Sequence, residues 1–183
     1  MEDLPPHAQP CWVLESREIF NLPVWALISV DTVALPSGQI VDDYWQIKLH
    51  VSVVYAQTQN GEILLLEEYR HGARRCGLEF PAGRLEEGED PLMAAQRELL
   101  EETGYHSEQW ESLGSYALSS TQGVGVGHVF RADGAVHVQE PCSGDLEIVQ
   151  LQLVSKDRLR QTVRNGEFTT LYHLAVIGAA LFH

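Results

Sequence analysis

Hydrophobic and β-branched residues form several runs in the first third of the chain, and turn-forming residues separate these runs. The runs predict strands at residues 11–20, 24–35, 40–57 and 62–70. The PSG sequence at 36–38 separates the second strand from the third. Asn60 and Gly61 supply the positive φ angles of a tight turn between the third and the fourth. The pattern therefore predicts antiparallel hairpins at the start of the chain.

The pattern changes to a helical one after residue 90. Asp90 and Pro91 are a favourable N-cap and first-turn pair, and Gly104 is placed to end the helix. Weaker patterns predict strands at 112–118, 127–132 and 147–154, and helices at 157–163 and 169–181. Strands and helices without regular βαβ alternation predict an α/β protein of the α+β type, in which helices sandwich a mixed β-sheet.

The first 45 residues are expected to form a small antiparallel β layer, and residues 46–183 the main domain. Trp12, Trp25 and Trp45 would be unusual on a free surface, so the layer is expected to cover a second subunit in a homodimer. The alternative is that these residues are ordinary core aromatics. No internal repeat interrupts either segment.

Composition limits the classes of function. The chain has 183 residues, 44% of them hydrophobic, and a formal net charge of −14, which repels nucleic-acid backbones and anionic lipid surfaces. Three cysteines without C-x-x-C spacing favour neither a disulfide framework nor a zinc site. The first ten residues lack the features of a secretory signal, and the most apolar segment is too short to span a bilayer. We therefore expect a soluble cytoplasmic protein.

The predicted helix carries an acidic face. At roughly 100° per residue, Leu92, Gln96 and Leu99 share one sector, while the opposite sector of about 140° holds charged side chains. These side chains are Arg97, Glu98, Glu101 and Glu102. The like-charged pair at i and i+4 costs a few tenths of a kcal/mol, so a solvated face is one reading. A site for a hard divalent cation is the other.

The sequence around the helix decides between these readings. Residues 83–105 fit the pattern G-x(5)-E-x(7)-R-E-U-x-E-E-x-G-U, where U is bulky and apolar. The matching residues are Gly83, Glu89, Arg97, Glu98, Leu99, Glu101, Glu102, Gly104 and Tyr105. This stretch resembles the Nudix box of hydrolases that cleave a nucleoside diphosphate linked to another group. The resemblance implies a Nudix fold for the main domain.

The resemblance also implies a set of metal ligands. In the family, the second and last glutamates of the box hold the metal, which here assigns Glu98 and Glu102 to Mg²⁺, with Mn²⁺ as a possible substitute. Glu101 assists catalysis and metal binding, and the backbone carbonyl of Ala82 joins the ligands. Arg97 is expected to orient the glutamates through charge-assisted hydrogen bonds. Glu89 is expected to have a structural role.

The segments before the box narrow the expected substrate. Residues 68–70 (EYR) and 79–83 (EFPAG) resemble those of ADP-ribose and nucleoside-diphosphate-sugar pyrophosphatases. Arg70 is a candidate phosphate ligand, because a guanidinium forms two-pronged bonds to phosphate, although an ion pair with Glu79 or a box glutamate is an alternative or coexisting role. Glu79 and Trp45 are further candidate substrate contacts.

A general base is expected in an acidic loop after the box. By resemblance, Asp145 and Glu147 are the candidates, Glu140 is a less favoured one, and all could be plain loop carboxylates. The expected reaction is metal-assisted hydrolysis of the diphosphate of ADP-ribose or another nucleotide sugar. Residues 115–132 lack the Ser-Pro-Gly and glutamate of many ADP-ribose pyrophosphatases, so other nucleotide sugars stay open. The alternatives are a Nudix enzyme for dinucleoside polyphosphates or oxidised nucleotides, and a non-catalytic nucleotide sensor.

Overall fold

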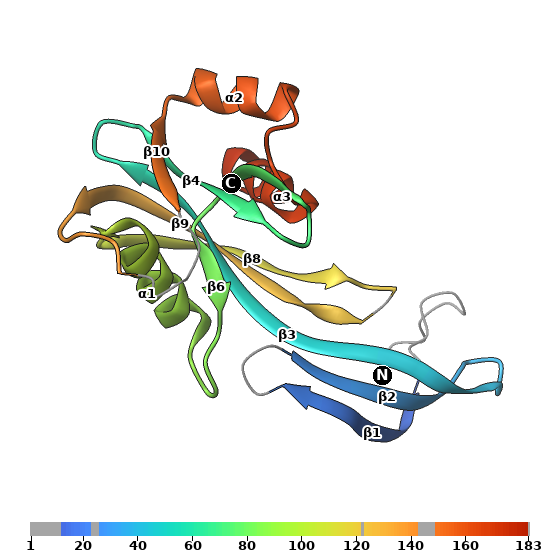
Figure 1. Ribbon diagram of the computed structural model, residues 1–183. Helices are drawn as coiled ribbons and strands as arrows, with labels where there is room; N and C mark the ends of the chain where they lie inside the picture. Colours follow the sequence, from blue (N-terminus) through green and yellow to red (C-terminus); the bar gives the residue numbers. More distant parts are fainter. Residues whose placement is uncertain (1–11, 23–25, 122, 143–148, 183) are drawn as a thin grey trace. The chain divides into compact units, whose positions relative to one another are not determined.

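The computed structural model describes residues 12–22, 26–121, 123–142 and 149–182, and Figure 1 shows its elements. The chain divides into two compact units. The first runs to Leu49 and includes Ala117–Val126, and the second comprises His50–Tyr116 and Gly127–His183. The first unit thus takes in a later hairpin segment as well as the N-terminal strands. The division into a dimerising layer at 1–45 and a hydrolase domain at 46–183 stays a prediction.

The first unit is an antiparallel sheet. Strand β1 (Trp12–Leu22) pairs with β2 (Ala26–Ala34), which pairs with the first part of β3 (Ile40–Thr58), as predicted for this part of the chain. The sheet leaves large apolar side chains exposed, and Trp12 and Trp45 are both 54% accessible. Trp25 lies outside the described residues. Trp12 and Trp45 are therefore not core residues of the isolated chain.

The second unit contains the remaining strands. These are the rest of β3, β4 (Ile63–Arg70), β5 (Arg75–Glu79), β6 (Ala82–Arg84), β7 (Tyr105–His106), β8 (Gln109–Ser119), β9 (Val124–His137) and β10 (Gln150–Val154), of which β8 and β9 extend into the first unit. Strand β4 is antiparallel to β5 and to β10, and β6 is antiparallel to β3. The pairing of β6 with β3 fixes the position of the strand that precedes the loop to residues 91–103.

Alternation along the strands separates two hydrophobic clusters. On β3, Val53 and Tyr55 belong to one cluster, whereas Val54 and Ala56 belong to the other. The first cluster includes residues of α2 (Lys156–Arg164) and α3 (Leu171–Phe182), and the second includes residues of α1 (Pro91–Thr103). Because successive side chains of a strand point to opposite faces, the sheet lies between α1 and the pair α2 and α3. The predicted α+β fold is confirmed.

The sequence predicted the helices more closely than the short strands. The expected helices at 90–103, 157–163 and 169–181 correspond to α1, α2 and α3 within two residues at each end. Strands β5, β6 and β7 were not predicted. No helix among the described residues is long and apolar enough to cross a bilayer.

Candidate active site

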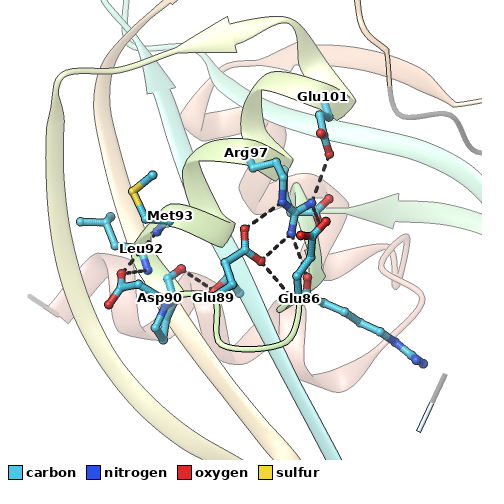
Figure 2. A network of polar contacts seen from close by, with 11 residues as sticks. Glu86, Glu89, Asp90, Leu92, Met93, Arg97 and Glu101 are labelled. Carbon is cyan, nitrogen blue, oxygen red and sulfur yellow. Dashed lines mark hydrogen bonds and ion pairs between the residues drawn. The ribbon is translucent and has the colours of Figure 1, made fainter. Parts of the chain in front are cut away.

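Helix α1 has well-defined ends. The Asp90 carboxylate accepts hydrogen bonds from the backbone N–H groups of Leu92, at 2.9 Å, and Met93, at 3.4 Å (Figure 2). Pro91 occupies the first turn, where no N–H donor is needed. At the other end Gly104 adopts a φ of +73° and donates its N–H to the Leu100 carbonyl. These caps fix where the helix starts and ends, and therefore which way its glutamates point.

Arg97 organises the charged face of α1 (Figure 2). Its Nε and Nη2 each donate to a different Glu89 oxygen at 2.9 Å, and its Nη1 donates to Glu98 at 2.6 Å and to Glu101 at 3.1 Å. Nη2 also donates to the backbone carbonyl of Arg84 at 2.9 Å. The hydrogen bonds to Glu89 raise the pKa of Arg97 further above its usual range, and those to Glu98 and Glu101 add to the effect. Arg97 thus ties the helix to the loop before it.

Glu98 and Glu102 both approach the backbone at the start of β6. The backbone N–H of Ala82 donates to Glu102 Oε2 at 2.9 Å. The Glu98 carboxylate fills the space beside Gly83, so closely that a Cβ atom there would overlap it. The glycine is therefore needed for close approach. A strand start and two glutamates, separated in sequence by 15 residues or more, meet at one place.

The electrostatics around Glu102 favour a bound cation. Burial raises the pKa of Glu102 well above its usual value, and the negative charges of Glu98 and Glu68 raise it further. The Ala82 N–H group and Arg70 act in the opposite direction but do not compensate. Carboxylate oxygens lacking sufficient positive charge are a suitable environment for a hard divalent ion. The donor set therefore fits the metal implied by the box.

No three His, Cys, Asp or Glu side chains in the described part of the chain form a ready metal-binding group. Arg97 holds Glu98 and Glu101 through its own Nη1.

Arg70 lies in a second charged cluster. Its Nη2 is 2.5 Å from Glu68 Oε1 and 3.0 Å from Glu79 Oε2, and its Nε donates to the same Glu79 oxygen at 3.0 Å. The two glutamates are almost completely buried, whereas 39% of the Arg70 side chain is accessible. The ion pair that the sequence allowed for Arg70 is present, and the guanidinium still reaches solvent.

The partners of Glu79 include residues that sequence reasoning missed. Thr169 donates a hydrogen bond to Glu79 Oε1, and His173 Nε2 lies 3.4 Å from Oε2. Burial opposes ionisation of Glu79, but the bonds from His173 and Thr169, together with Arg70, outweigh it and lower the pKa of Glu79 to about 2. The available signal was a single histidine within the apolar segment LYHLAVIGAALF of α3.

The other predicted site residues are distributed differently. Trp45 is exposed and belongs to the first compact unit. Asp145 and Glu147 lie outside the described residues, whereas Glu140 is described and exposed. Shortly after Glu140, the backbone N–H of Cys142 donates to the Glu101 carbonyl at 2.7 Å. The segment that leads to the candidate bases is thus attached to the last turn of α1.

Known proteins of several kinds are similar to this chain. The Bacillus methanolicus protein named methanol dehydrogenase activator is 40% identical over 123 residues, which cover 66% of this chain and 65% of that protein. The ADP-ribose pyrophosphatase of Bacillus subtilis (strain 168) is 35% identical over 141 residues, which cover 75% of each protein. A crystal structure of an ADP compounds hydrolase matches the fold with a TM-score of 0.77 at 14% identity, covering 94% of this chain and 92% of that one.

A family model adds to the motif and its geometry. The model of the NUDIX domain matches residues 47–173, which contain α1, Arg97 and the acidic cluster around it. The match includes most of the second compact unit and more than half of the chain. Taken with the arrangement of the box residues, it shows that this chain belongs to the Nudix family of hydrolases.

Proposed function

We propose that the chain hydrolyses the diphosphate bond of ADP-ribose or another nucleoside diphosphate sugar, giving a nucleoside monophosphate and a sugar phosphate. The observation that carries this proposal is the meeting of Glu98 and Glu102 at the Ala82–Gly83 backbone, with Arg70 close enough to influence Glu102. The similarity to a Bacillus subtilis ADP-ribose pyrophosphatase supports the substrate class.

The identity of the metal ion and of its ligands is also part of this proposal. Nudix hydrolases generally need a divalent metal ion, and we assign Mg²⁺, with Mn²⁺ as a substitute. Glu98, Glu102 and the Ala82 carbonyl would hold it, with Glu101 assisting. Such a bound ion supplies positive charge to the non-bridging phosphate oxygens and acidifies water. The hydrogen bonds of Arg97 to Glu98 and Glu101 support a role in orienting these ligands.

The remaining groups act on the substrate. Arg70 offers a planar guanidinium to a diphosphate oxygen, and Glu79 holds it in place. Water attacks phosphorus, its oxygen forms the new P–O bond, and the bond to the bridging oxygen breaks. A carboxylate after the box, Glu147 or Asp145, takes the proton from the water. The attachment of Cys142 to Glu101 supports this assignment, because it holds the start of that loop at the acidic helix.

The assembly and location proposed here rest on surface features. The exposed tryptophans Trp12 and Trp45 support a homodimer in which the first unit covers a second copy, and Trp45 could then contact substrate. Cys76 and Cys142 carry free, exposed thiols, which suits the reducing cytoplasm. The partner during catalysis is a small nucleotide sugar, and we propose no role for nucleic acid or membrane.

A substrate panel tests the proposed reaction. ADP-ribose, other nucleotide sugars, dinucleoside polyphosphates and oxidised nucleoside triphosphates are each assayed with Mg²⁺ and with Mn²⁺. We expect the highest kcat/KM on a diphosphate bridged to a sugar. A preference for a triphosphate or polyphosphate would replace the substrate class, and binding without turnover of any compound would favour a sensor.

A pair of matched substitutions tests the metal site. Glu102→Gln removes a proposed ligand, and we expect kcat/KM to fall at least about a hundredfold while the protein stays folded, because a charge in the site contributes several kcal/mol. Glu87→Gln is the control, because it makes the same chemical change at an exposed position of the box loop. Equal activity of the Glu102→Gln variant and the control would contradict the metal assignment.

A further inference from the structure

A buried polar cluster surrounds Glu79, the residue that holds Arg70, and two of its members have no role in the proposed reaction. It consists of Glu79 on β5 with Thr169 and His173 from the C-terminal part of the chain. We propose that His173 is a positioning residue, which fixes Glu79 and through it orients the Arg70 guanidinium toward the substrate diphosphate. This inference rests on the proposed function, because it gives a purpose to the phosphate contact assigned to Arg70.

The contacts of His173 determine which ring nitrogen carries the proton. The side chain is completely buried, and its Nδ1 lies 3.3 Å from the backbone nitrogen of Phe80, whose N–H donates to it. Because Nδ1 accepts, a neutral ring carries its proton on Nε2. Burial lowers the pKa of His173, which keeps the ring neutral. The orientation set by Phe80 therefore turns an N–H donor toward Glu79.

The Nε2 donor faces the Glu79 carboxylate. It lies 3.4 Å from Glu79 Oε2, and among the described residues it makes no hydrogen bond that meets the geometric criteria. A buried imidazole donor without an acceptor is costly, so the negative charge of the nearby carboxylate is what offsets the cost of this orientation. The contact between His173 and Glu79 is therefore electrostatic, and it draws the carboxylate toward the ring.

Glu79 is held at both oxygens. Oε1 accepts from Thr169, and Oε2 accepts from Arg70 at 3.0 Å and faces His173. The backbone also braces this arrangement, because Leu78 N–H donates to the Glu167 carbonyl at 2.8 Å and Leu78 forms a parallel bridge with Phe168. The segment before α3 is thereby fixed against β5. Little rotational freedom is left to the Glu79 carboxylate.

The restraint passes from Glu79 to Arg70. Glu79 binds Nε and Nη2 of the guanidinium, and Glu68 binds Nη2 from another direction. The contacts at these two nitrogens restrain the orientation of the group, while 39% of the side chain is still accessible to solvent. A planar fork needs this orientation to bind phosphate through two parallel bonds. His173 thus acts on the substrate at a distance, through two intervening side chains.

Two substitutions separate positioning from packing. His173→Gln places an amide nitrogen near the position of Nε2 and keeps a donor for Glu79, whereas His173→Asn keeps an acceptor for Phe80 and loses that donor. We expect the Asn variant to raise KM for ADP-ribose about tenfold, the scale of one hydrogen bond to a charged group, and the Gln variant to stay within about threefold of wild type. A residue needed only for the fold should tolerate Asn at least as well as Gln, and that result would overturn the inference.

A second pair of variants, at Thr169, tests the inference if neither His173 variant folds. Thr169 is only partly buried, and Thr169→Ser keeps the hydroxyl donor to Glu79 whereas Thr169→Val removes it at nearly constant volume. We expect Val, but not Ser, to raise KM. Equal KM values for the two variants would contradict the restraint on Glu79. Thermal unfolding of each variant confirms that the comparison is made between folded proteins.

The Arg70→Ala background distinguishes the inference from the function on which it rests. If His173 acts through Arg70, His173→Asn should raise KM in the wild type but not further in Arg70→Ala. A full additional increase would overturn the inference alone. If Arg70→Ala itself leaves KM unchanged, the proposed phosphate contact is wrong instead. The tautomer gives an independent readout, because NMR of ¹⁵N-labelled histidine should show His173 neutral and protonated at Nε2, and protonation at Nδ1 would refute the geometry.

Discussion

A single methyl group at Gly83 tests the geometry of the proposed metal site. The ideal Cβ position of an alanine there would lie 1.9 Å from Glu98 Oε1, whereas real Cβ contacts stay beyond 3.0 Å. The backbone of Gly83 does not have a positive φ, so alanine is compatible with the chain itself. The overlap is with the end of a flexible side chain. Gly83→Ala should therefore displace the Glu98 carboxylate and leave the fold intact.

The size of the effect follows from the displacement. Glu98 must move by about 1.1 Å to restore a 3.0 Å contact. A misplacement of about 1 Å in a catalytic constellation costs about a hundredfold in rate, or about 2.7 kcal/mol of transition-state stabilisation. We expect the loss in kcat/KM to be accompanied by a higher metal concentration for half-maximal activity. The free energy of unfolding should fall by only about 1 kcal/mol, the contribution of one hydrogen bond to Arg97.

The assay compares the variant with Gly178→Ala. Gly178 lies in α3 and a Cβ there meets no atom within 4 Å, so the control adds the same methyl group without an overlap. Initial rates of ADP-ribose hydrolysis are measured across a range of Mg²⁺ and Mn²⁺ concentrations, with thermal unfolding of both variants. If Gly83→Ala keeps the kcat/KM and the metal dependence of wild type, the position of Glu98 beside Gly83 does not matter for catalysis.

Three other properties can be predicted. The folded-state pKa of Glu79 is lowered from 4.5 to about 2. The stabilising contribution of its ionised form is therefore present above about pH 4.5 and is lost as the pH falls toward about 2. Urea unfolding should show this loss, up to about 3 kcal/mol in the free energy of unfolding, in wild type but not in Glu79→Gln. Asp90→Ala should lower the free energy of unfolding by about 1 kcal/mol through loss of the α1 cap, and an unchanged urea midpoint would contradict the capping role. Light scattering should give twice the 20.5 kDa of one chain, and Trp12→Lys should shift the mass toward the monomer.

The sequence predicted α1 closely because the signals that define it are local. Asp90, Pro91 and Gly104 lie at its ends, and their effects act within one helical turn. The tight turn is also local, because Gly61 has the predicted positive φ, +81°, although Asn60, predicted to share it, does not. Such features need only neighbouring residues. A single chain is therefore enough to locate them.

The strands that the sequence missed depend on distant partners. Strand β6 has only three residues and exists because Ala82, Gly83 and Arg84 pair with residues 51–53 of β3. Strand β5 contains Arg75, Cys76 and Gly77, a composition that does not favour a strand, yet it pairs along its whole length with β4. Tertiary pairing overrides local preference in both cases. The hydrophobic periodicity within each segment does not reveal this pairing.

The residues of the candidate site also fall into two groups, those predicted from local spacing and those that only the fold brings together. The box motif predicts roles for Glu98, Glu102 and Arg97, and these roles stay a prediction; the spacing of the three residues is fixed by the helix itself. The motif gave no reason to connect Glu79 with His173, which are 94 positions apart on different elements and meet only when β5 pairs with the segment before α3. A lone histidine among apolar residues is the signal that such a connection leaves. Its partner can be identified only from the fold.

The distribution of charge explains how an acidic chain can act on an anionic substrate. Two guanidiniums, Arg70 and Arg97, are surrounded by carboxylates of Glu68, Glu79, Glu89, Glu98 and Glu101, so both are neutralised by the protein before a substrate arrives. The proposed metal ions would supply positive charge that these two arginines have already shared with carboxylates. Substrate affinity should consequently depend more steeply on the divalent metal than on the ionic strength that screens surface charge.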